Sequence, residues 1–356
     1  MAARRCLACA KRWSVLTATT EPLAKWTTLR LGGPARSFER ALTRGALFAA
    51  VAACDDAAIP VLVLGGGSNL VVADQGFDGT VLQVGNLGIV TGGDQCAGAE
   101  VTAEAGEDWD ALVARTVVAD MVGVEALSGI PGTVGAVPIQ NVGAYGQEVA
   151  ETIAQVHVFD RWERRARTLF AADCGFGYRT SVFKREADHY VVGAVTFQFR
   201  FGDLGAPVRY GELARALGVV EGQRAPLADV RKAVLALRSA KGMVLDDDDR
   251  DTWSAGSFFT NPFVEPHALP QGAPRWPQPD GTVKTSAAWL IEQAGFMRGY
   301  GNDRVRLSTK HTLALTNRGT ASTADLLALA AEIRDAVRRR FGITLVPEPT
   351  CVGCSV

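Results

Sequence analysis

The segment over 127–146, LSGIPGTVGAVPIQNVGAYG, restricts the fold of this chain more than any other stretch. Its five glycines and two prolines interrupt an apolar run that is too irregular for a helix or a strand. Gly129, Gly132 and Gly135 recur every third residue. A backbone without Cβ lets a ligand approach closely and donates N–H groups to phosphate oxygens. The alternative is a tightly packed glycine-rich turn, and this segment alone leaves both interpretations open.

A second glycine cluster lies upstream and favours the ligand-binding interpretation. Residues 59–64, IPVLVL, predict a buried strand that runs directly into GGGSN at 65–69. A Rossmann fingerprint needs G-x-G-x-x-G at the start of a helix, whereas this chain continues as LVVAD, which is typical of a strand. Two non-Rossmann glycine loops, about 60 residues apart, therefore indicate one long anionic ligand such as a dinucleotide, held by backbone amides.

Hydrophobic periodicity predicts helices and strands along the first 200 residues. The expected strands are 59–64, segments near 70–84, 99–105, 154–159 and 190–200. A helix is expected over 41–53. Another begins near Trp109, where an apolar helical face follows the acidic pair Glu107 and Asp108, which suits a helix N-terminus.

The pattern becomes helical at Pro226. The helix expected there begins at a proline and ends near a glycine, which both residues favour, so we place a domain boundary just before it. The acidic run DDDDRD at 246–251 predicts a solvated loop, because clustered like charges resist burial, and it lacks the glycine and spacing of a calcium loop. Ser322 and Asp325 resemble a capping box that opens a helix with an apolar core stripe.

Composition and charge limit the classes of partner. The chain has 356 residues, of which 47% are hydrophobic and 21% charged, enough for two or three domains. With 37 Lys and Arg against 38 Asp and Glu, the formal net charge of −1 gives no field that would attract nucleic acid or an anionic membrane. No apolar run approaches the ~20 residues of a membrane span. We therefore expect a cytoplasmic protein whose anionic ligands meet a few placed cations.

Cysteines and histidines exclude several chemistries. Seven cysteines fit a reducing compartment better than a disulfide framework. Cys6 and Cys9 form one C-x-x-C pair and Cys351 and Cys354 another, and these four thiols would bind zinc only if the termini met; we expect no metal. The sequence contains neither H-E-x-x-H nor G-x-S-x-G, which disfavours zinc hydrolysis and acyl transfer by a catalytic triad. Redox chemistry carried by a bound cofactor needs fewer reactive side chains.

A series of motifs occurs in order along the chain. They are TTLRLGG (27–33), GGGSN (65–69), SGIPGTVGAVPIQNVGAYG (128–146), GYRTSVFK (177–184), YGEL (210–213), GSFFTNP (256–262), KTSAAWLIEQAGF (284–296), LALTNRG (313–319) and PEP (347–349). Together they resemble the UDP-N-acetylenolpyruvoylglucosamine reductases, which are flavoenzymes of bacterial peptidoglycan synthesis. Only about the first 20 residues lie outside the resemblance.

The resemblance implies an α+β fold with an FAD-binding domain of the vanillyl-alcohol-oxidase and p-cresol-methylhydroxylase type, followed by a smaller α+β substrate-binding domain. The expected divisions are an N-terminal extension (1–20), the FAD-binding domain (21–222, with subdomains 21–85 and 86–222) and the substrate-binding domain (223–356). We expect a monomer or a weak homo-oligomer.

The resemblance also implies the reaction. NADPH would reduce a non-covalently held FAD, which would pass hydride to the enolpyruvyl ether of UDP-N-acetylglucosamine and yield UDP-N-acetylmuramate for cell-wall synthesis, cell shape and division. Hydride addition to the alkene pushes charge into the conjugated carboxylate, so the enolate-like intermediate needs a cation, a hydrogen-bond donor and then a proton.

Three residues match the family's catalytic positions. Arg179 is implied as the cation, since a guanidinium binds carboxylate bidentately and stays charged. Ser257 is implied as the proton donor, and Glu348, between two prolines, as the third member that polarises the substrate carboxylate or positions a water. Without the motifs, Arg179 would be interpreted as a surface arginine, Ser257 as a turn hydroxyl and Glu348 as an exposed carboxylate.

Binding residues are implied in the same way. Tyr210 matches a tyrosine that covers the substrate's nucleotide part in one subgroup, which places this chain in the subgroup with the extra tyrosine loop. The other implied substrate contacts are Lys241, Asn261, His311 and Arg298, the last in a segment, 297–303, that departs in length from the family pattern. The implied FAD contacts are Gly65, Gly66, Gly67, Ser68, Asn69, Ser128, Gly129, Gly132, Gly135, Gln140, Asn141 and Gly143, of which Asn69, Gln140 and Asn141 alternatively satisfy turns.

Two other functions remain open at the level of the sequence. An oxidase on the same fold, with oxygen as acceptor, would keep the glycine loops but lack the set Arg179, Ser257 and Glu348. A catalytically inactive flavin or nucleotide sensor would keep the glycines and lose the acid and the cation. The intact motifs GSFFTNP and PEP favour the reductase over both.

Overall fold

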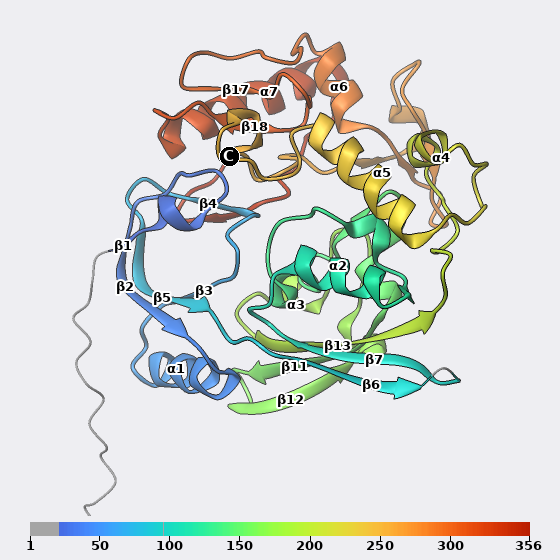
Figure 1. Cartoon of the computed structure of the whole chain (residues 1–356). Coiled ribbons are helices and arrows are strands. Elements are labelled where there is room, and N and C mark those ends of the chain that lie inside the picture. Colours follow the sequence, from blue (N-terminus) through green and yellow to red (C-terminus); the bar gives the residue numbers. More distant parts are fainter. Residues whose placement is uncertain (1–20, 95) are drawn as a thin grey trace, which may run out of the picture.

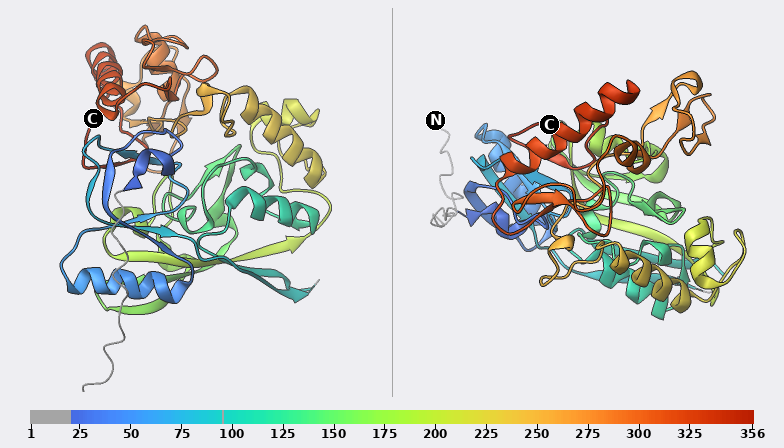
Figure 2. Two further views of the ribbon diagram at one scale, coloured as in Figure 1. Left: turned by 60° about the vertical axis from the view of Figure 1, so that its left-hand side comes forward. Right: turned by 90° about the horizontal axis from the view of Figure 1, so that it is seen from above.

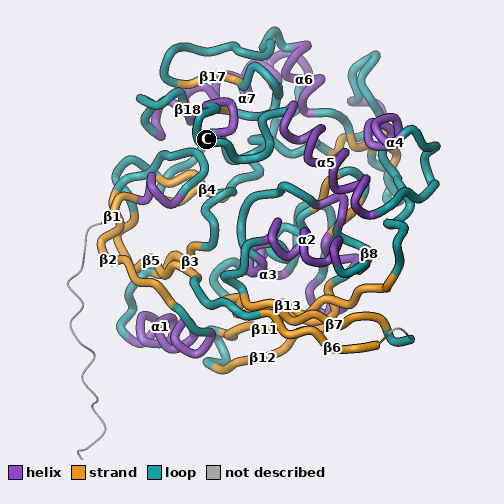
Figure 3. Tube along the Cα trace, viewed as in Figure 1, coloured by secondary structure: helices purple, strands orange, loops and turns teal. Residues whose placement is uncertain are grey.

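The structure, a computed structural model, describes residues 21–94 and 96–356, so the expected extension over 1–20 lies outside the described residues. Two sheets with their covering helices form the lower part of the molecule in Figure 1, and a unit of helices and loops from the C-terminal third lies above them. In the C-terminal third, long loops connect strands of two or three residues, as Figure 3 shows. The α+β class that the resemblance implies is confirmed.

The first sheet has the strand order β1-β2-β5-β3. Its strands are β1 (Glu21–Pro22), β2 (Pro34–Ala41), β3 (Val61–Leu64) and β5 (Phe77–Val84), with β2 and β3 parallel to β5. Helix α1 (Arg44–Asp56) packs against it through Leu47 and Val51. The helix expected over 41–53 exists but starts later, because Ala41 belongs to β2 and the Thr43 hydroxyl caps the helix by accepting from the Ala46 N–H.

The second sheet is antiparallel, with the order β12-β11-β13-β7-β6, and β8 pairs with β13. Its strands are β6 (Ile89–Asp94), β7 (Gly98–Glu104), β8 (Met121–Val122), β11 (Ile153–Asp160), β12 (Arg165–Phe170) and β13 (Tyr190–Phe201). Helices α2 (Trp109–Val118) and α3 (Val182–Arg185) lie over one face (Figure 1). Trp109 is fully buried against Phe197, and the Asp108 carboxylate caps α2 by accepting from the Ala111 N–H, as the acidic pair predicts.

Helices α4 (Gly211–Leu217) and α5 (Leu227–Ala240) follow β13. The expected helix from Pro226 is confirmed as α5. Its residues Val230 and Val234 share a core with Ala126 and Leu213, so α5 packs beside α2 in both Figure 1 and Figure 2. The boundary predicted before Pro226 therefore stays a proposal, and this packing favours a later one, after α5.

The C-terminal unit is built around α7 (Thr323–Phe341), which begins at the predicted capping box: Ser322 and Asp325 exchange side-chain and backbone hydrogen bonds. Its apolar stripe is buried, as expected. The other elements are α6 (Ala287–Gln293), β14 (Phe263–Val264), β15 (Trp276–Pro277), β16 (Val283–Lys284), β17 (Val305–Leu307) and β18 (Leu315–Asn317). The last strand, β19 (Thr350–Val352), returns to the first unit and pairs in parallel with β4 (Leu70–Val72).

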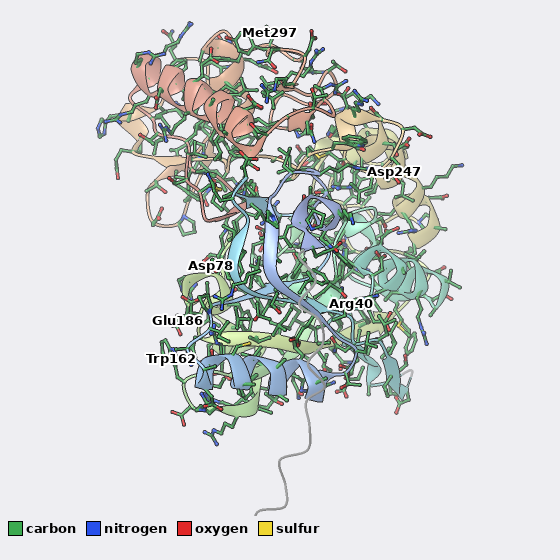
Figure 4. All side chains as sticks on the ribbon, turned by 90° about the vertical axis from the view of Figure 1, so that its left-hand side faces the viewer. Arg40, Asp78, Trp162, Glu186, Asp247 and Met297 are labelled. Carbon is green, nitrogen blue, oxygen red and sulfur yellow. The ribbon has the colours of Figure 1, made fainter. Side chains whose placement is uncertain are left out.

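The acidic run over 246–251 begins as the exposed loop that its charge predicts, over 246–248, but its last residue is buried. Asp251 is buried and accepts from Arg318, while Lys310 forms an ion pair with Asp249. Asp247, labelled in Figure 4, has an exposed carboxylate that pairs with Arg30. Cations from three distant segments neutralise the repulsion that makes such a run resist burial.

Candidate active site

The two predicted glycine loops meet in space. A Cβ on Gly66 would lie 2.8 Å from the Gly132 Cα, and a Cβ on Gly132, where φ is +124°, would lie 2.9 Å from the Ser68 Oγ. The Ser68 hydroxyl donates to the Pro131 carbonyl at 3.0 Å. Glycine is thus required where backbone lies directly against backbone. The loops form one continuous surface, as expected for two segments that hold a single ligand.

A cavity of about 270 Å³ opens over this surface. Of the predicted FAD contacts, Gly65, Gly66, Gly67, Ser68, Asn69, Gly132, Gln140 and Gly143 line it. A second cavity of about 680 Å³ shares Gly65, Gly66 and Thr133 with the first and extends past Trp26 and Trp253. Pockets for ligands of this kind measure roughly 300–1,000 Å³. The two cavities therefore adjoin at the first glycine loop, which suits an elongated ligand.

Four predicted FAD contacts lie outside the cavity lining: Ser128, Gly129, Gly135 and Asn141. The Ser128 hydroxyl is fully buried and donates to the Glu125 carbonyl at 2.7 Å. A Cβ on Gly135 would lie 2.5 Å from that of Ala105. Packing explains Ser128 and Gly135, as in the alternative interpretation of a glycine-rich turn, and the role of the four positions as FAD contacts stays a prediction.

Gly129 and Asn141 have similar structural roles. The Gly129 N–H donates to the Asp110 carboxylate at 2.6 Å, which fastens the loop to the first turn of α2. Asn141 is buried in the left-handed region (φ 46°), and its amide donates to the Glu148 carboxylate at 2.7 Å and to the Gly177 carbonyl at 3.1 Å. Asn141 therefore supports the segment that carries Arg179, and its role as a flavin contact stays a prediction.

The predicted catalytic residues Arg179, Ser257 and Glu348 all line the first cavity. Arg179 is held in a left-handed conformation (φ 53°), and its Nη2 donates to the Gly143 carbonyl at 2.7 Å. Its Nε lies 3.0 Å from Oε1 of Glu348, an ion pair whose N–H is not aligned for a hydrogen bond. The ring centre of Tyr178 lies 5.5 Å from the guanidinium carbon of Arg179.

Backbone hydrogen bonds join the segments that carry Ser257 and Glu348. The Glu348 N–H donates to the Phe258 carbonyl at 2.9 Å, directly after Ser257. On the other side, the Thr350 N–H donates to the Asn69 carbonyl at 2.9 Å in the β19–β4 pair. The proposed acid, the proposed proton donor and the glycine loop are therefore connected through the main chain, which fixes their separation.

Burial dominates the electrostatics around Glu348. Burial raises the pKa of Glu348 above its ordinary value, although Arg179 and Lys184 oppose the shift. Burial likewise lowers the pKa of Lys184, which Glu348 partly restores. The site thus favours a carboxyl group that binds a proton more readily than usual. Lys184 belongs to the motif GYRTSVFK, but the motif alone did not identify it as a neighbour of the acid.

The predicted nucleotide-binding residues form a second cluster. Lys241, at the end of α5, forms an ion pair with Glu212 and lies 5.6 Å from the ring centre of Tyr145. Tyr145 contacts Tyr210 edge to face at 5.7 Å, and Tyr210 is 47% exposed. Burial, with the positive charges of Lys241, Arg298 and Arg238, lowers the pKa of His311 to about 4. Four of the predicted substrate contacts therefore lie in one charged cluster: Tyr210, Lys241, Arg298 and His311.

Asn261 forms its side-chain contact at the start of α6. Its Oδ1 accepts from the Ala287 N–H at 2.9 Å at the start of α6, and its segment leads from Ser257 to β14. Its role as a substrate contact stays a prediction.

Arg238 is a site residue that sequence reasoning missed. It lines the first cavity from α5, and one of its Nη atoms donates to the Met243 carbonyl at 2.7 Å, while its buried Nε has no partner among the described residues. Burial lowers the pKa of Arg238 to about 10. A buried guanidinium with an unused donor beside the glycine loops suits an anionic group of the ligand. In the sequence, Arg238 is one arginine among several on an amphipathic helix, and only packing identifies it.

No group of three or more His, Cys, Asp or Glu residues within 21–94 and 96–356 has the arrangement of a metal site. Cys6 and Cys9, which the zinc alternative requires, lie outside the described residues. Across the same described part, no helix is both long and apolar enough to cross a bilayer.

Comparisons with known proteins agree with this geometry. Residues 40–163 match the FAD binding domain model, and residues 248–352 match the model of the UDP-N-acetylenolpyruvoylglucosamine reductase C-terminal domain. The reductase of Cutibacterium acnes is 54% identical over 94% of this chain and 90% of its own length. That of Thermobifida fusca is 55% identical over 94% of this chain and 98% of its own length.

A solved structure has the same fold. The UDP-N-acetylenolpyruvylglucosamine reductase of Thermus caldophilus aligns with a TM-score of 0.64 at 24% identity, over 94% of this chain and 98% of that chain. An FAD-binding domain followed by a reductase C-terminal domain is thus confirmed, as is the resemblance carried by the motifs. The chain belongs to the UDP-N-acetylenolpyruvoylglucosamine reductase family.

Proposed function

We propose that this chain is the FAD-dependent oxidoreductase that reduces the enolpyruvyl ether of UDP-N-acetylglucosamine to UDP-N-acetylmuramate, with NADPH as hydride donor, in peptidoglycan precursor synthesis. One observation carries the proposal: Arg179, Ser257 and Glu348, from three distant motifs, line a single cavity together with both glycine loops. An oxidase or a flavin sensor needs the loops but not this set of cation, acid and hydroxyl.

The residues present fit FAD. The glycines allow the close approach of a diphosphate, and Arg238 contributes a buried unused donor beside them. The two cavities on either side of Gly65 and Gly66 accommodate the two ends of a long dinucleotide. When bound, FAD supplies the hydride, and the chain's own residues act on the substrate.

Arg179 is the group that stabilises developing charge. Hydride addition at the alkene moves negative charge onto the substrate carboxylate, and a guanidinium fixed in place before the reaction costs no reorganisation. Its contacts to the Gly143 carbonyl and to Glu348 fix the side chain while its Nη1 stays available. Because burial raises the pKa of Glu348, this carboxyl group is suited to be protonated when the substrate carboxylate lies beside it.

Ser257 is the proposed proton donor to the carbon next to the carboxylate. A hydroxyl is a weak acid, so its proton moves only to a strongly basic carbanion in a site from which water is excluded. The hydrogen bond from the Glu348 N–H to the Phe258 carbonyl holds the donor at a fixed distance from the acid. Arg179 and Ser257 thereby act on neighbouring atoms of one substrate.

We further propose a cytoplasmic enzyme, monomeric or weakly oligomeric, that belongs to the subgroup with the extra tyrosine loop. Free Cys54, Cys96, Cys174, Cys351 and Cys354 among the described residues fit a reducing compartment. Size-exclusion chromatography over a range of concentrations measures the oligomeric state.

The experiment that tests the function is an anaerobic absorbance titration of the purified protein. Addition of NADPH should bleach a flavin spectrum, and the UDP-linked enolpyruvyl ether should restore it with formation of UDP-N-acetylmuramate. Recovery of the spectrum with oxygen and not with the ether would favour an oxidase. A colourless protein that does not bind added FAD would refute the proposal.

A further inference from the structure

Lys241, which the resemblance assigns to the substrate, forms an ion pair with Glu212. The carboxylate of Glu212 therefore lies where an anionic group of the ligand would contact Lys241. Lys241 Nζ lies 2.5 Å from Glu212 Oε2, and the two side chains are 33% and 31% exposed. Lys241 follows α5, whereas Glu212 lies in the first turn of α4, two residues after Tyr210. The pair therefore connects the segment that carries Tyr210 to the cation predicted to bind the ligand.

Positive charge exceeds negative charge around this pair. Lys241, Arg298 and Arg238 all act to lower the pKa of His311, whereas Glu212 acts in the opposite direction. Glu212 also acts to raise the pKa values of Tyr145 and Tyr210, so it faces the whole cluster. Three cations and one carboxylate leave an excess of positive charge that matches a diphosphate.

We propose that Glu212 is a displaceable counter-ion of Lys241, and that it sets the affinity of this site for diphosphate-bearing ligands. The inference rests on the proposed function, which assigns Lys241 to a nucleotide ligand. A diphosphate and a carboxylate at the same ammonium group repel each other, so the ligand must move Glu212 away before Lys241 contacts it. Glu212 thereby weakens binding and speeds release, although it contributes no contact to the bound ligand.

Calorimetric binding of UDP to the flavin-loaded protein tests the proposal. Glu212→Gln keeps the size of the side chain and removes the charge, so it should tighten UDP binding by about fivefold. Uridine, which has no phosphate, should bind equally to both proteins. The matched control is Asp229→Asn, which removes an exposed carboxylate from the first turn of α5, at the other end of that helix from Lys241, and should leave UDP affinity unchanged.

The diphosphate can come from the UDP-sugar or from the dinucleotide donor, and a parallel titration with NADP+ distinguishes them. Tightening for UDP assigns the counter-ion to the UDP-sugar, and tightening for NADP+ alone assigns it to the donor. Unchanged or weaker binding of both ligands to Glu212→Gln, while the wild type binds UDP, would overturn the inference and leave the proposed function intact. A wild type that binds neither ligand would instead overturn the proposed function.

Steady-state kinetics gives a second test. If Glu212 had a purely structural role, its replacement would not lower KM for the UDP-sugar. Glu212→Gln should lower KM for the UDP-sugar without raising kcat, because release of a more tightly held product is no faster. Glu212→Ala should behave in the same way, and both variants should match the wild type in thermal unfolding. A raised KM in both variants would show that Glu212 positions Lys241, contrary to the proposal.

Discussion

Replacement of Gly66 by alanine tests the idea that the two glycine loops form one cofactor surface. The added Cβ would lie 2.8 Å from the Gly132 Cα and 3.3 Å from the Gly132 carbonyl carbon. Carbon atoms in contact lie roughly 3.5–4.0 Å apart, so the loops must separate by about 1 Å. Both partners are backbone atoms, so no rotation of a side chain relieves the clash.

This separation should cost about 1–3 kcal/mol, as overpacking does in other cores. It also moves the amides of the two loops apart, so FAD affinity should fall by about tenfold to a hundredfold. Fluorescence titration of the apoprotein with FAD measures the affinity, and chemical denaturation measures the loss of stability.

Gly45→Ala is the matched control, because a Cβ at Gly45, in the first turn of α1, meets no atom within 4 Å. It should leave FAD affinity unchanged and slightly favour the helix. Wild-type FAD affinity in Gly66→Ala would refute the geometry of the paired loops. Equal loss of affinity in both variants would show that the effect does not arise from the contact with Gly132.

Three further predictions concern catalysis, pH dependence and the support of the loops. Ser257→Ala should leave flavin reduction by NADPH nearly intact and slow reoxidation by substrate about a hundredfold, some 2.7 kcal/mol, in stopped-flow absorbance; equal slowing of both half-reactions would contradict the role of proton donor. The pKa of His311 falls from 6.5 to about 4 on folding, so the unfolded chain binds more protons between these values and stability drops as the pH falls from 6.5 to 4. His311→Gln should remove up to about 3 kcal/mol of this dependence in denaturation curves, and an unchanged pH profile would refute the burial argument. Asp110→Asn should cost about 1–2 kcal/mol in the same assay, because Arg231 and the Gly129 N–H lose their shared carboxylate; wild-type stability would show that this link is not needed.

Sequence reasoning identified the features that depend on local pattern. The β3 segment before Gly65, the caps at Asp108 and Ser322 and the helix after Pro226 each have a short-range signal, and the structure confirms them. Arg179, Ser257 and Glu348 were found through motifs, and their convergence in one cavity needed the structure. Motif order along the chain carries no information about distance in space.

The features that were missed depend on long-range packing. Asp251, the last residue of the acidic run, is buried because its partner Arg318 lies 67 residues away in sequence, which the local charge pattern does not show. Arg238 is one arginine among several on α5, and only its burial beside the first cavity distinguishes it. A charged or polar side chain is chemically compatible with several partners. Which partner it contacts depends on the fold.

The pairing of β19 with β4 connects the acid to the first glycine loop. This strand begins two residues after Glu348 and is hydrogen-bonded to residues that follow the first glycine loop. Thr350 of β19, Asn69 and Glu348 all line the first cavity. Separating the two units there would break a strand ladder and displace Glu348 at the same time. A change that loosens this ladder should therefore weaken ligand binding and catalysis together, although it touches neither the ligand nor the reacting atoms.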